Sequence, residues 1–263
     1  MSFSQVVSTG DAEIEVLRIT EQRPEVFVLP GAAGGISAYA DLCERLTADG
    51  LPTVGLNPRG CGASVGNLRD LTLEALAADV TGVMMALRGS PAVLVGHAGG
   101  NRIARVVATE HPCMVRGTVL LAAGGKIPIA ADAVAAMLRA SDTTRSADER
   151  TRAVAEAYFA PANQHLAAEL PHDSSAAFSR AFQEALQKVP VDHWWAGGTA
   201  PMLVLQGRED RIATVANGHL LADEYPDRVQ VVDIDNAGHA LYVEQPEEIT
   251  RLIVGWVRGL PPG

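Results

Sequence analysis

The sequence predicts an α/β protein with a mostly parallel, twisted sheet that carries helices on both faces. Short apolar segments alternate along the chain with longer segments of helical spacing. The apolar segments are continuous runs, as in Ala92–Val95, which is typical of parallel strands buried on both sides. Such alternation indicates βαβ units joined by right-handed crossovers, in a sheet covered by helices on each side.

The first half of the chain supplies most of the predicted sheet. Helices are expected where apolar residues recur every three or four positions, as Tyr39, Leu42 and Leu46 do before Gly50. In chain order the predicted elements are a hairpin of strands Gln5–Ser8 and Glu13–Ile19, strand Glu25–Leu29, helix Ser37–Ala48, strand Pro52–Leu56, helix Leu71–Leu87, strand Ala92–Val95, a helix ending at Glu110, and strand Gly117–Ala122.

The alternation stops between Lys126 and Gly198. This segment shows no strand pattern and is rich in alanine at helical spacing. A helical insertion of about 70 residues is too long for a plain loop, so we expect a cap over the carboxyl edge of the sheet. Residues 1–125 and 199–263 would form the core domain, and residues 126–198 the cap. The core resumes with strand Pro201–Gln206, helix Thr214–Glu224, strand Val229–Ile234 and a helix near Glu247–Val257.

Composition bounds the function. The 263 residues are 48% hydrophobic and 20% charged, as in soluble globular proteins. A net charge of −10 disfavours nucleic acid as a partner. Three widely spaced cysteines give neither a disulfide framework nor a metal-ligand pattern, so no metal and no cofactor are expected. The first residues lack signal-peptide features and no run is long enough for a membrane span, which predicts a cytoplasmic protein; a homodimer is left open.

The most informative motif follows the Ala92–Val95 strand. Gly96-His97-Ala98-Gly99-Gly100 sets glycines two before and directly after Ala98, so the chain can turn sharply between a strand and a helix. This layout resembles the nucleophile elbow G-x-S-x-G of the α/β-hydrolase family. Ala98 occupies the position of that family's nucleophile, and a methyl group cannot attack a carbonyl carbon. The resemblance covers nearly the whole chain and implies the α/β-hydrolase fold.

The resemblance also supplies an acid and a base. Asp210 follows the Pro201–Gln206 strand and His239 follows Val229–Ile234, in the family's order of nucleophile, acid and histidine. Asp210 would fix the tautomer of His239 and leave the other ring nitrogen free to act as a base. Glu209 is a rival acid whose position fits the family pattern less well.

The resemblance implies an oxyanion hole made of backbone amides. Pro30-Gly31-Ala32 matches the family's His-Gly-x segment, so the N–H groups of Ala32 and Gly99 would hold the oxyanion, and neither needs a serine at position 98. The segment 57–64 resembles the family's D-x-R-G-x-G-x-S loop, with Asn57 at its first position, and is expected to be architectural. Cys61 within it has no base nearby in sequence to activate its thiol.

Aromatic residues of the insertion are candidates for an apolar pocket or for holding the cap on the core. They are Trp194, Trp195, Tyr158 and Phe159, together with Met137. The chain has no phosphate-binding glycine loop, because no GK[ST] follows its glycines.

Three explanations for Ala98 remain. Alanine was introduced in place of serine, or it is native and the dyad works without a covalent intermediate, or it is native and the protein only binds a ligand or partner protein. An intact Asp210–His239 pair favours the first two, and we favour the second. The predicted function is hydrolysis of a small hydrophobic ester, lactone or related carbonyl compound. Carbon–carbon cleavage and cofactor-free oxygenation are alternatives that need only a base and an oxyanion site.

Overall fold

A computed structural model of the chain describes residues 2–32, 34–170 and 175–261. Its described part contains a nine-stranded sheet in the order β1-β2-β4-β3-β6-β7-β8-β9, with the short β5 paired to β2. The strands are β1 (Phe3–Ser8), β2 (Ala12–Arg18), β3 (Val26–Leu29), β4 (Thr53–Leu56), β5 (Val65–Gly66), β6 (Ala92–His97), β7 (Val115–Leu121), β8 (Met202–Gly207) and β9 (Val229–Ile234).

The sheet is parallel from β4 to β9 and antiparallel at its β1-β2 end. The predicted α/β class with a mostly parallel sheet is therefore confirmed. The predicted hairpin is present, with β1 and β2 in register from Phe3–Arg18 to Ser8–Glu13. The strand β5 was not predicted, because two residues carry no usable pattern.

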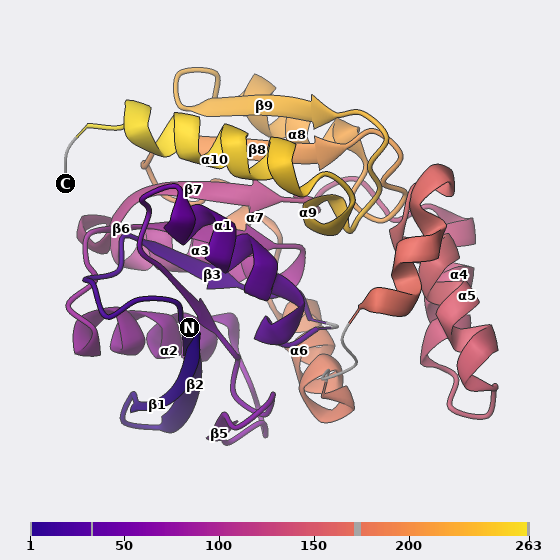
Figure 1. The fold of residues 1–263 in the computed structure, drawn as a ribbon, viewed down its shortest axis with the longest axis horizontal. Helices are drawn as coiled ribbons and strands as arrows, with labels where there is room; N and C mark the ends of the chain where they lie inside the picture. Colours follow the sequence, from indigo (N-terminus) through magenta and orange to yellow (C-terminus); the bar gives the residue numbers. More distant parts are fainter. Residues whose placement is uncertain (1, 33, 171–174, 262–263) are drawn as a thin grey trace.

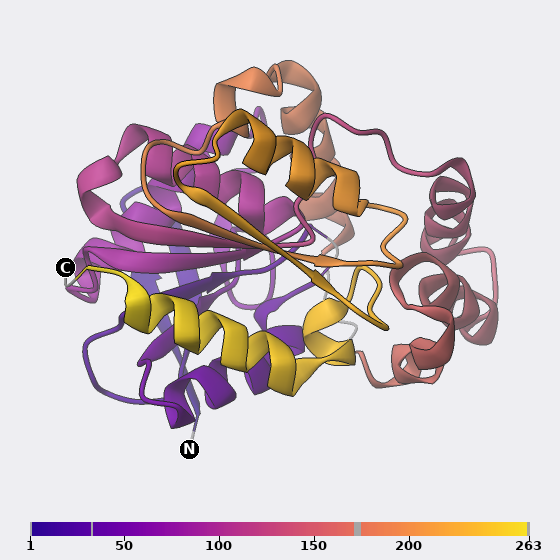
Figure 2. The ribbon, with the colours of Figure 1, turned by 90° about the horizontal axis from the view of Figure 1, so that it is seen from above.

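Helices cover both faces of the sheet, and Figure 2 shows α8 and α10 on opposite sides of it. One apolar cluster packs β-strand side chains against α2 and α3, and a second packs the other face against α1 and α10. The helices of the core are α1 (Ala40–Ala48), α2 (Leu73–Ala86), α3 (Gly99–Glu110), α8 (Val215–Glu224), α9 (Leu241–Glu244) and α10 (Pro246–Gly259), with short 3-10 turns η1 (Ile36–Tyr39) and η2 (Pro112–Met114). The predicted helix Ser37–Ala48 is thus split, with η1 as its first turn.

The segment between β7 and β8 is helical, and its described residues contain no strand. Figure 1 shows α4 and α5 beyond the arrowheads of the strands, at the carboxyl edge of the sheet, with α6 placed separately from them. These elements are α4 (Ala131–Ser141), α5 (Ala147–Tyr158), the 3-10 segment η3 (Pro161–Glu169), α6 (Ala176–Lys188) and α7 (Asp192–Trp195). None of the helices in the described part of the chain is long and apolar enough to cross a bilayer.

Candidate active site

The turn between β6 and α3 holds residue 98 at the carboxyl edge of the sheet. Ala98 is the N-cap of α3, with φ 47° and ψ −107°, and its N–H donates to the carbonyl of Leu121 at 3.0 Å. Only glycine fits at position 100, because an added Cβ would lie 2.1 Å from the carbonyl oxygen of Leu29. The positive φ of Ala98 strains the backbone of a residue that carries a Cβ. Strain of this kind is concentrated at functional sites. Residue 98 therefore has the strained backbone conformation of a tight strand-to-helix turn, although its side chain is only a methyl group.

This strain predicts that Ala98→Gly stabilises the fold. Removing the Cβ relieves a conformation that costs a non-glycine residue about 1–3 kcal/mol, and glycine's greater freedom in the unfolded chain offsets part of the gain. We expect the free energy of unfolding to rise by about 1 kcal/mol in urea titrations. Ala104→Gly, inside the same helix and buried, is the matched control and should destabilise. A loss of stability in both variants would contradict the prediction.

The acid and the base predicted from the sequence meet in the structure. Nδ1 of His239 lies 2.8 Å from Oδ2 of Asp210, whose side chain is fully buried. The other carboxylate oxygen of Asp210 accepts from the N–H groups of Ile212 at 2.8 Å and Ala213 at 2.9 Å. Because Nδ1 faces a carboxylate, it carries the proton, and Nε2 is the basic nitrogen. The rival acid Glu209 is exposed.

The two segments expected to supply the oxyanion amides lie against each other. A Cβ built on Gly99 would lie 3.0 Å from the backbone nitrogen of Ala32. The insertion reaches this point through α6. Its Ser179 hydroxyl donates to the carbonyl of Ala32 at 2.5 Å, and its Phe182 ring lies 2.9 Å from the same Cβ position on Gly99. Helix α6 therefore packs directly against the predicted oxyanion segments.

A second histidine, not identified from the sequence, lies beside the dyad. The Nε2–H of His97 donates to the carbonyl of His239 at 2.9 Å. Its Nδ1 accepts from the Tyr39 hydroxyl at 2.7 Å, and that hydroxyl accepts from the N–H of Gly31 at 3.0 Å. Burial, followed by repulsion from His239, lowers the pKa of His97 from 6.5 to about 3. This neutral imidazole connects the loop before Ala32 to the backbone of the catalytic candidate.

The lowered pKa of His97 predicts a loss of stability in mild acid. Below pH 6.5 the unfolded chain binds a proton that the folded chain excludes until about pH 3. Stability contributed by neutral His97 is therefore lost as the pH falls through this window, by about 1.4 kcal/mol per pH unit. Urea titrations at several pH values between 6.5 and 5 give the free energy of unfolding as a function of pH. This free energy should fall less steeply with decreasing pH in His97→Gln than in the native chain. His165→Gln, at an exposed position, should leave the slope unchanged; equal slopes in all three proteins would contradict the assignment.

Glu244 connects the insertion to the loop that carries His239. Its buried carboxylate accepts from Gly238 N–H at 2.7 Å, from Ala160 N–H at 2.8 Å and from the Asn163 side-chain amide at 3.2 Å. Burial raises the pKa of Glu244, and these hydrogen bonds oppose the rise. The sequence held only a weak signal for this role, namely an acidic residue five positions after His239.

The predicted pocket residues do not form one cluster. They are Met137, Tyr158, Phe159, Trp194 and Trp195. The ring centroid of Tyr158 lies 5.6 Å from that of His239. Phe159 belongs to a small cluster with Ala240, against which Tyr158 also packs, and it lines a hollow together with Asp210. The two tryptophans of α7 belong to the main core and stack with arginines of α3. Met137 is half-buried on α4. Tyr158 and Phe159 are thus the members of the set that lie near the dyad.

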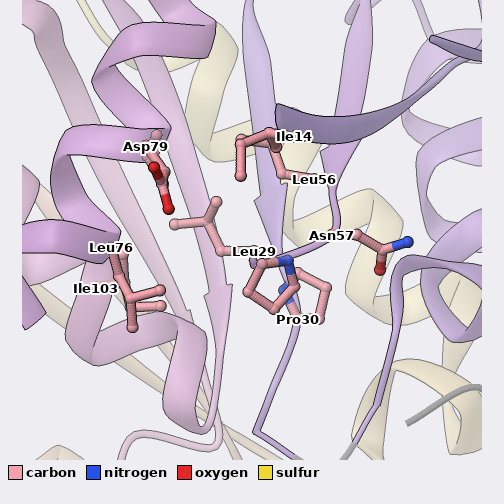
Figure 3. A pocket seen from close by; sticks show the side chains of 10 residues that line it. Ile14, Leu29, Pro30, Leu56, Asn57, Leu76, Asp79 and Ile103 are labelled. Atoms are coloured by element: carbon pink, nitrogen blue, oxygen red, sulfur yellow. The ribbon is translucent and has the colours of Figure 1, made fainter. Parts of the chain in front are cut away.

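Two hollows lie near these loops. A cavity of about 570 Å³ sits between α4, α5 and the loop after β8, on the Asp210 side of the dyad. Charged residues dominate its lining: Asp132, Arg139, Glu156, Arg208, Glu209 and Arg211. Figure 3 shows the other, a void of about 20 Å³ beneath Leu29 and Pro30. That volume has room for about one water molecule, so it does not hold a substrate.

The remaining predictions fall on ordinary structural positions. Cys61 is buried in the main core cluster. Within the segment 57–64, Asn57 accepts from the N–H of Ile36 at 2.7 Å, and Arg59 forms a buried ion pair with Asp79 at 2.7 Å. No group of three or more His, Cys, Asp or Glu side chains in the described residues could hold a metal ion.

Comparison with known proteins identifies the scaffold. Residues 20–246 match the family described as serine aminopeptidase, S33. An esterase from Exiguobacterium antarcticum superposes with a TM-score of 0.82 at 19% identity, covering 98% of this chain and 100% of the esterase. A bacterial membrane phospholipase A gives 0.81 at 22% identity, covering 98% and 86%. E-2-(acetamidomethylene)succinate hydrolase gives 0.72 at 22%, covering 98% and 100%. No match was found among curated proteins.

Proposed function

Because the chain belongs to the serine aminopeptidase S33 family and has the α/β-hydrolase fold, we propose that it hydrolyses a small ester or lactone without a covalent intermediate. His239 is the general base, Asp210 orients it, and the N–H groups of Ala32 and Gly99 hold the oxyanion. Ala98 contributes by its small size, since a methyl group leaves space where a serine side chain would extend. Residues 126–198 act as the cap over this site.

The proposed reaction needs only these groups. Nε2 of His239 takes a proton from water as the water oxygen attacks the carbonyl carbon. The negative charge that develops on the carbonyl oxygen is held by the two backbone amides. Collapse of the tetrahedral intermediate expels the alkoxide, which takes the proton back from the imidazolium. Asp210 stabilises that imidazolium while it exists.

The observation that carries the proposal is the contact between Asp210 and His239. Their 2.8 Å hydrogen bond lies in a buried setting, and the second carboxylate oxygen is fixed by two further amides. A protein that only binds a ligand has little physical need for an imidazole oriented in this way. Oxyanion-hole and binding effects alone leave roughly 10³–10⁴-fold catalysis in triads that lose a member, so useful rates are within reach of a dyad.

A substrate panel tests the proposal. Activated esters and lactones are followed by pH-stat, and dioxygen uptake is followed with enolisable ring substrates. Release of acid from an ester or lactone above the rate in buffer is the expected result. Dioxygen uptake without acid release would replace hydrolysis by oxygenation at the same dyad. Ligand binding with no turnover of any panel member would overturn the proposal in favour of a binding protein.

A further inference from the structure

Two arginines of α3 have no acidic partner among the described residues, and of these Arg105 is buried and Arg102 is half-buried. Arg105 is fully buried, and its guanidinium donates to Asn101 Oδ1 at 2.7 Å and to the carbonyls of Gly124 at 3.0 Å and Trp195 at 3.3 Å. Arg102 forms no hydrogen bond or ion pair with the described residues, and its Nε is buried without a partner. A buried cation without a counter-ion is costly, and in most proteins it is paired.

The surrounding charges do not compensate these arginines. Lys126, the third cation of the region, binds Glu224 at 2.9 Å and Asp192 at 3.5 Å, and the carboxylate of Asp210 is held by His239 and two backbone N–H groups. Burial lowers the pKa of Arg102, and burial together with repulsion from Arg102 lowers that of Arg105 to about 9. In a chain with a net charge of −10, Arg102 and Arg105 thus form a local pair of cations without a carboxylate partner among the described residues. An anion placed there would compensate them.

Arg102 is held by aromatic packing. Its guanidinium carbon lies 5.2 Å from the centre of the Trp194 ring, and that of Arg105 lies 4.7 Å from the same ring. A cation–π contact of this kind holds the guanidinium without using its N–H groups as donors to an oxygen acceptor. The Trp194 ring therefore positions Arg102 and leaves its hydrogen-bonding capacity unused.

The position of Arg102 relates it to the proposed active site. It follows Gly99 by three residues in α3, so both residues lie on the same face, about 4.5 Å apart along the helix axis. One of its terminal nitrogens lies 3.9 Å from the Cβ position of Gly124, and that position contacts Ala213 at 3.6 Å. The N–H of Ala213 is one of the two that hold the carboxylate of Asp210. Arg102 is thus close to both the oxyanion segment and the acid's loop.

We propose that Arg102 binds a carboxylate of the substrate, so that the substrate is a short ester or related acyl compound with a free carboxylate a few atoms from its reacting carbonyl. The assignment rests on the proposed function, since it uses the same site. With the carbonyl oxygen at the amide of Gly99, a carboxylate one helical turn away meets the unpaired guanidinium. A charge-assisted, two-point contact of this kind discriminates strongly against the neutral analogue.

Binding of stable analogues tests the proposal independently of catalysis. Succinamate, which carries one carboxylate, and succinamide, which carries none, are titrated calorimetrically into the native chain, Arg102→Met, Arg102→Lys and Arg180→Met. Arg180 is an exposed arginine of α6 and gives the same change of charge at a solvent-facing position. Circular dichroism and melting curves establish that each variant is folded.

We expect the native chain and Arg180→Met to bind succinamate at least ~10-fold more tightly than succinamide. Arg102→Met should lose that preference, and Arg102→Lys should keep part of it because the charge remains. Three results would each overturn the proposal. The native chain binds both probes with equal affinity, it does not bind succinamate at millimolar concentration, or Arg102→Met and Arg180→Met lose the preference for succinamate to the same extent. If Arg102→Met does not fold, Arg102→Lys decides. A preference that is reduced in Arg102→Lys but not in Arg180→Met supports the carboxylate site, and an unchanged preference in Arg102→Lys overturns it.

Turnover separates this inference from the proposed function. Arg102-dependent binding of succinamate without hydrolysis of any ester would retain the carboxylate site and reject the hydrolase. Equal kcat/KM for monomethyl and dimethyl succinate, unchanged in Arg102→Met, would retain the hydrolase and reject the carboxylate site.

Discussion

Replacing Asp210 by asparagine is expected to lower kcat for the best ester of the panel by about 10³–10⁴-fold, with little change in fold. The Oδ1 position accepts from two backbone N–H groups, so the amide oxygen of asparagine must take that place. The side-chain NH2 then faces Nδ1 of His239, which has to become an acceptor. The proton moves to Nε2, and the imidazole can no longer accept a proton from water at that nitrogen.

Steady-state kinetics with the adjacent acid as control checks this prediction. Glu209→Gln changes an exposed carboxylate by the same chemistry and should leave kcat within about twofold. Equal kcat values for Asp210→Asn and Glu209→Gln would show that the buried pair does not orient a catalytic base.

Introducing serine at position 98 is expected to convert the mechanism to a covalent one and to raise activity. The elbow already holds the backbone in the strained conformation at φ 47°, and the lone pair on His239 Nε2 is the base that a serine hydroxyl requires. We expect kcat to rise by roughly 100-fold or more, since loss of the serine from a complete triad costs about 10⁶. A burst of released alcohol and an acyl adduct in the intact mass should accompany the rise.

The size of that rise also bears on why residue 98 is alanine. A gain near ~10⁶ would indicate a site adapted to serine, and a smaller gain is expected of a site adapted to direct attack by water. The double variant Ala98→Ser, His239→Ala is the control and should give neither burst nor adduct. Absence of both gain and adduct in Ala98→Ser itself would contradict the proposed alignment of elbow and histidine.

Much of the fold could be predicted because its signals are local. Continuous apolar strands and the glycines around residue 98 determine a buried sheet and a sharp turn without reference to the rest of the chain. The predicted helix Ser37–Ala48 was wrong in its first turn, because helical periodicity does not distinguish a 3-10 turn from an α-helix over four residues. The 3-10 segment Pro161–Glu169 was missed for a related reason, since its side chains show little amphipathic pattern.

The site was predictable only where the family pattern fixes a spacing. Ala98, Asp210 and His239 follow three strands whose carboxyl ends meet at one edge, so the order of the chain was sufficient. His97 and Glu244 act through long-range contacts with Tyr39 and Ala160 that no local pattern encodes. The aromatic residues of the insertion lie in more than one place, because α7 packs its tryptophans against arginines of α3, whereas Phe159 lines the hollow beside Asp210.

The rate of ester hydrolysis by His239→Ala, compared with the native chain under the same conditions, tests the central claim most directly. The native chain, with alanine at position 98, should hydrolyse the ester above the rate in buffer. The variant should fall to the buffer rate, and added imidazole should restore part of the loss. An unchanged rate in His239→Ala would contradict the claim that this imidazole activates water.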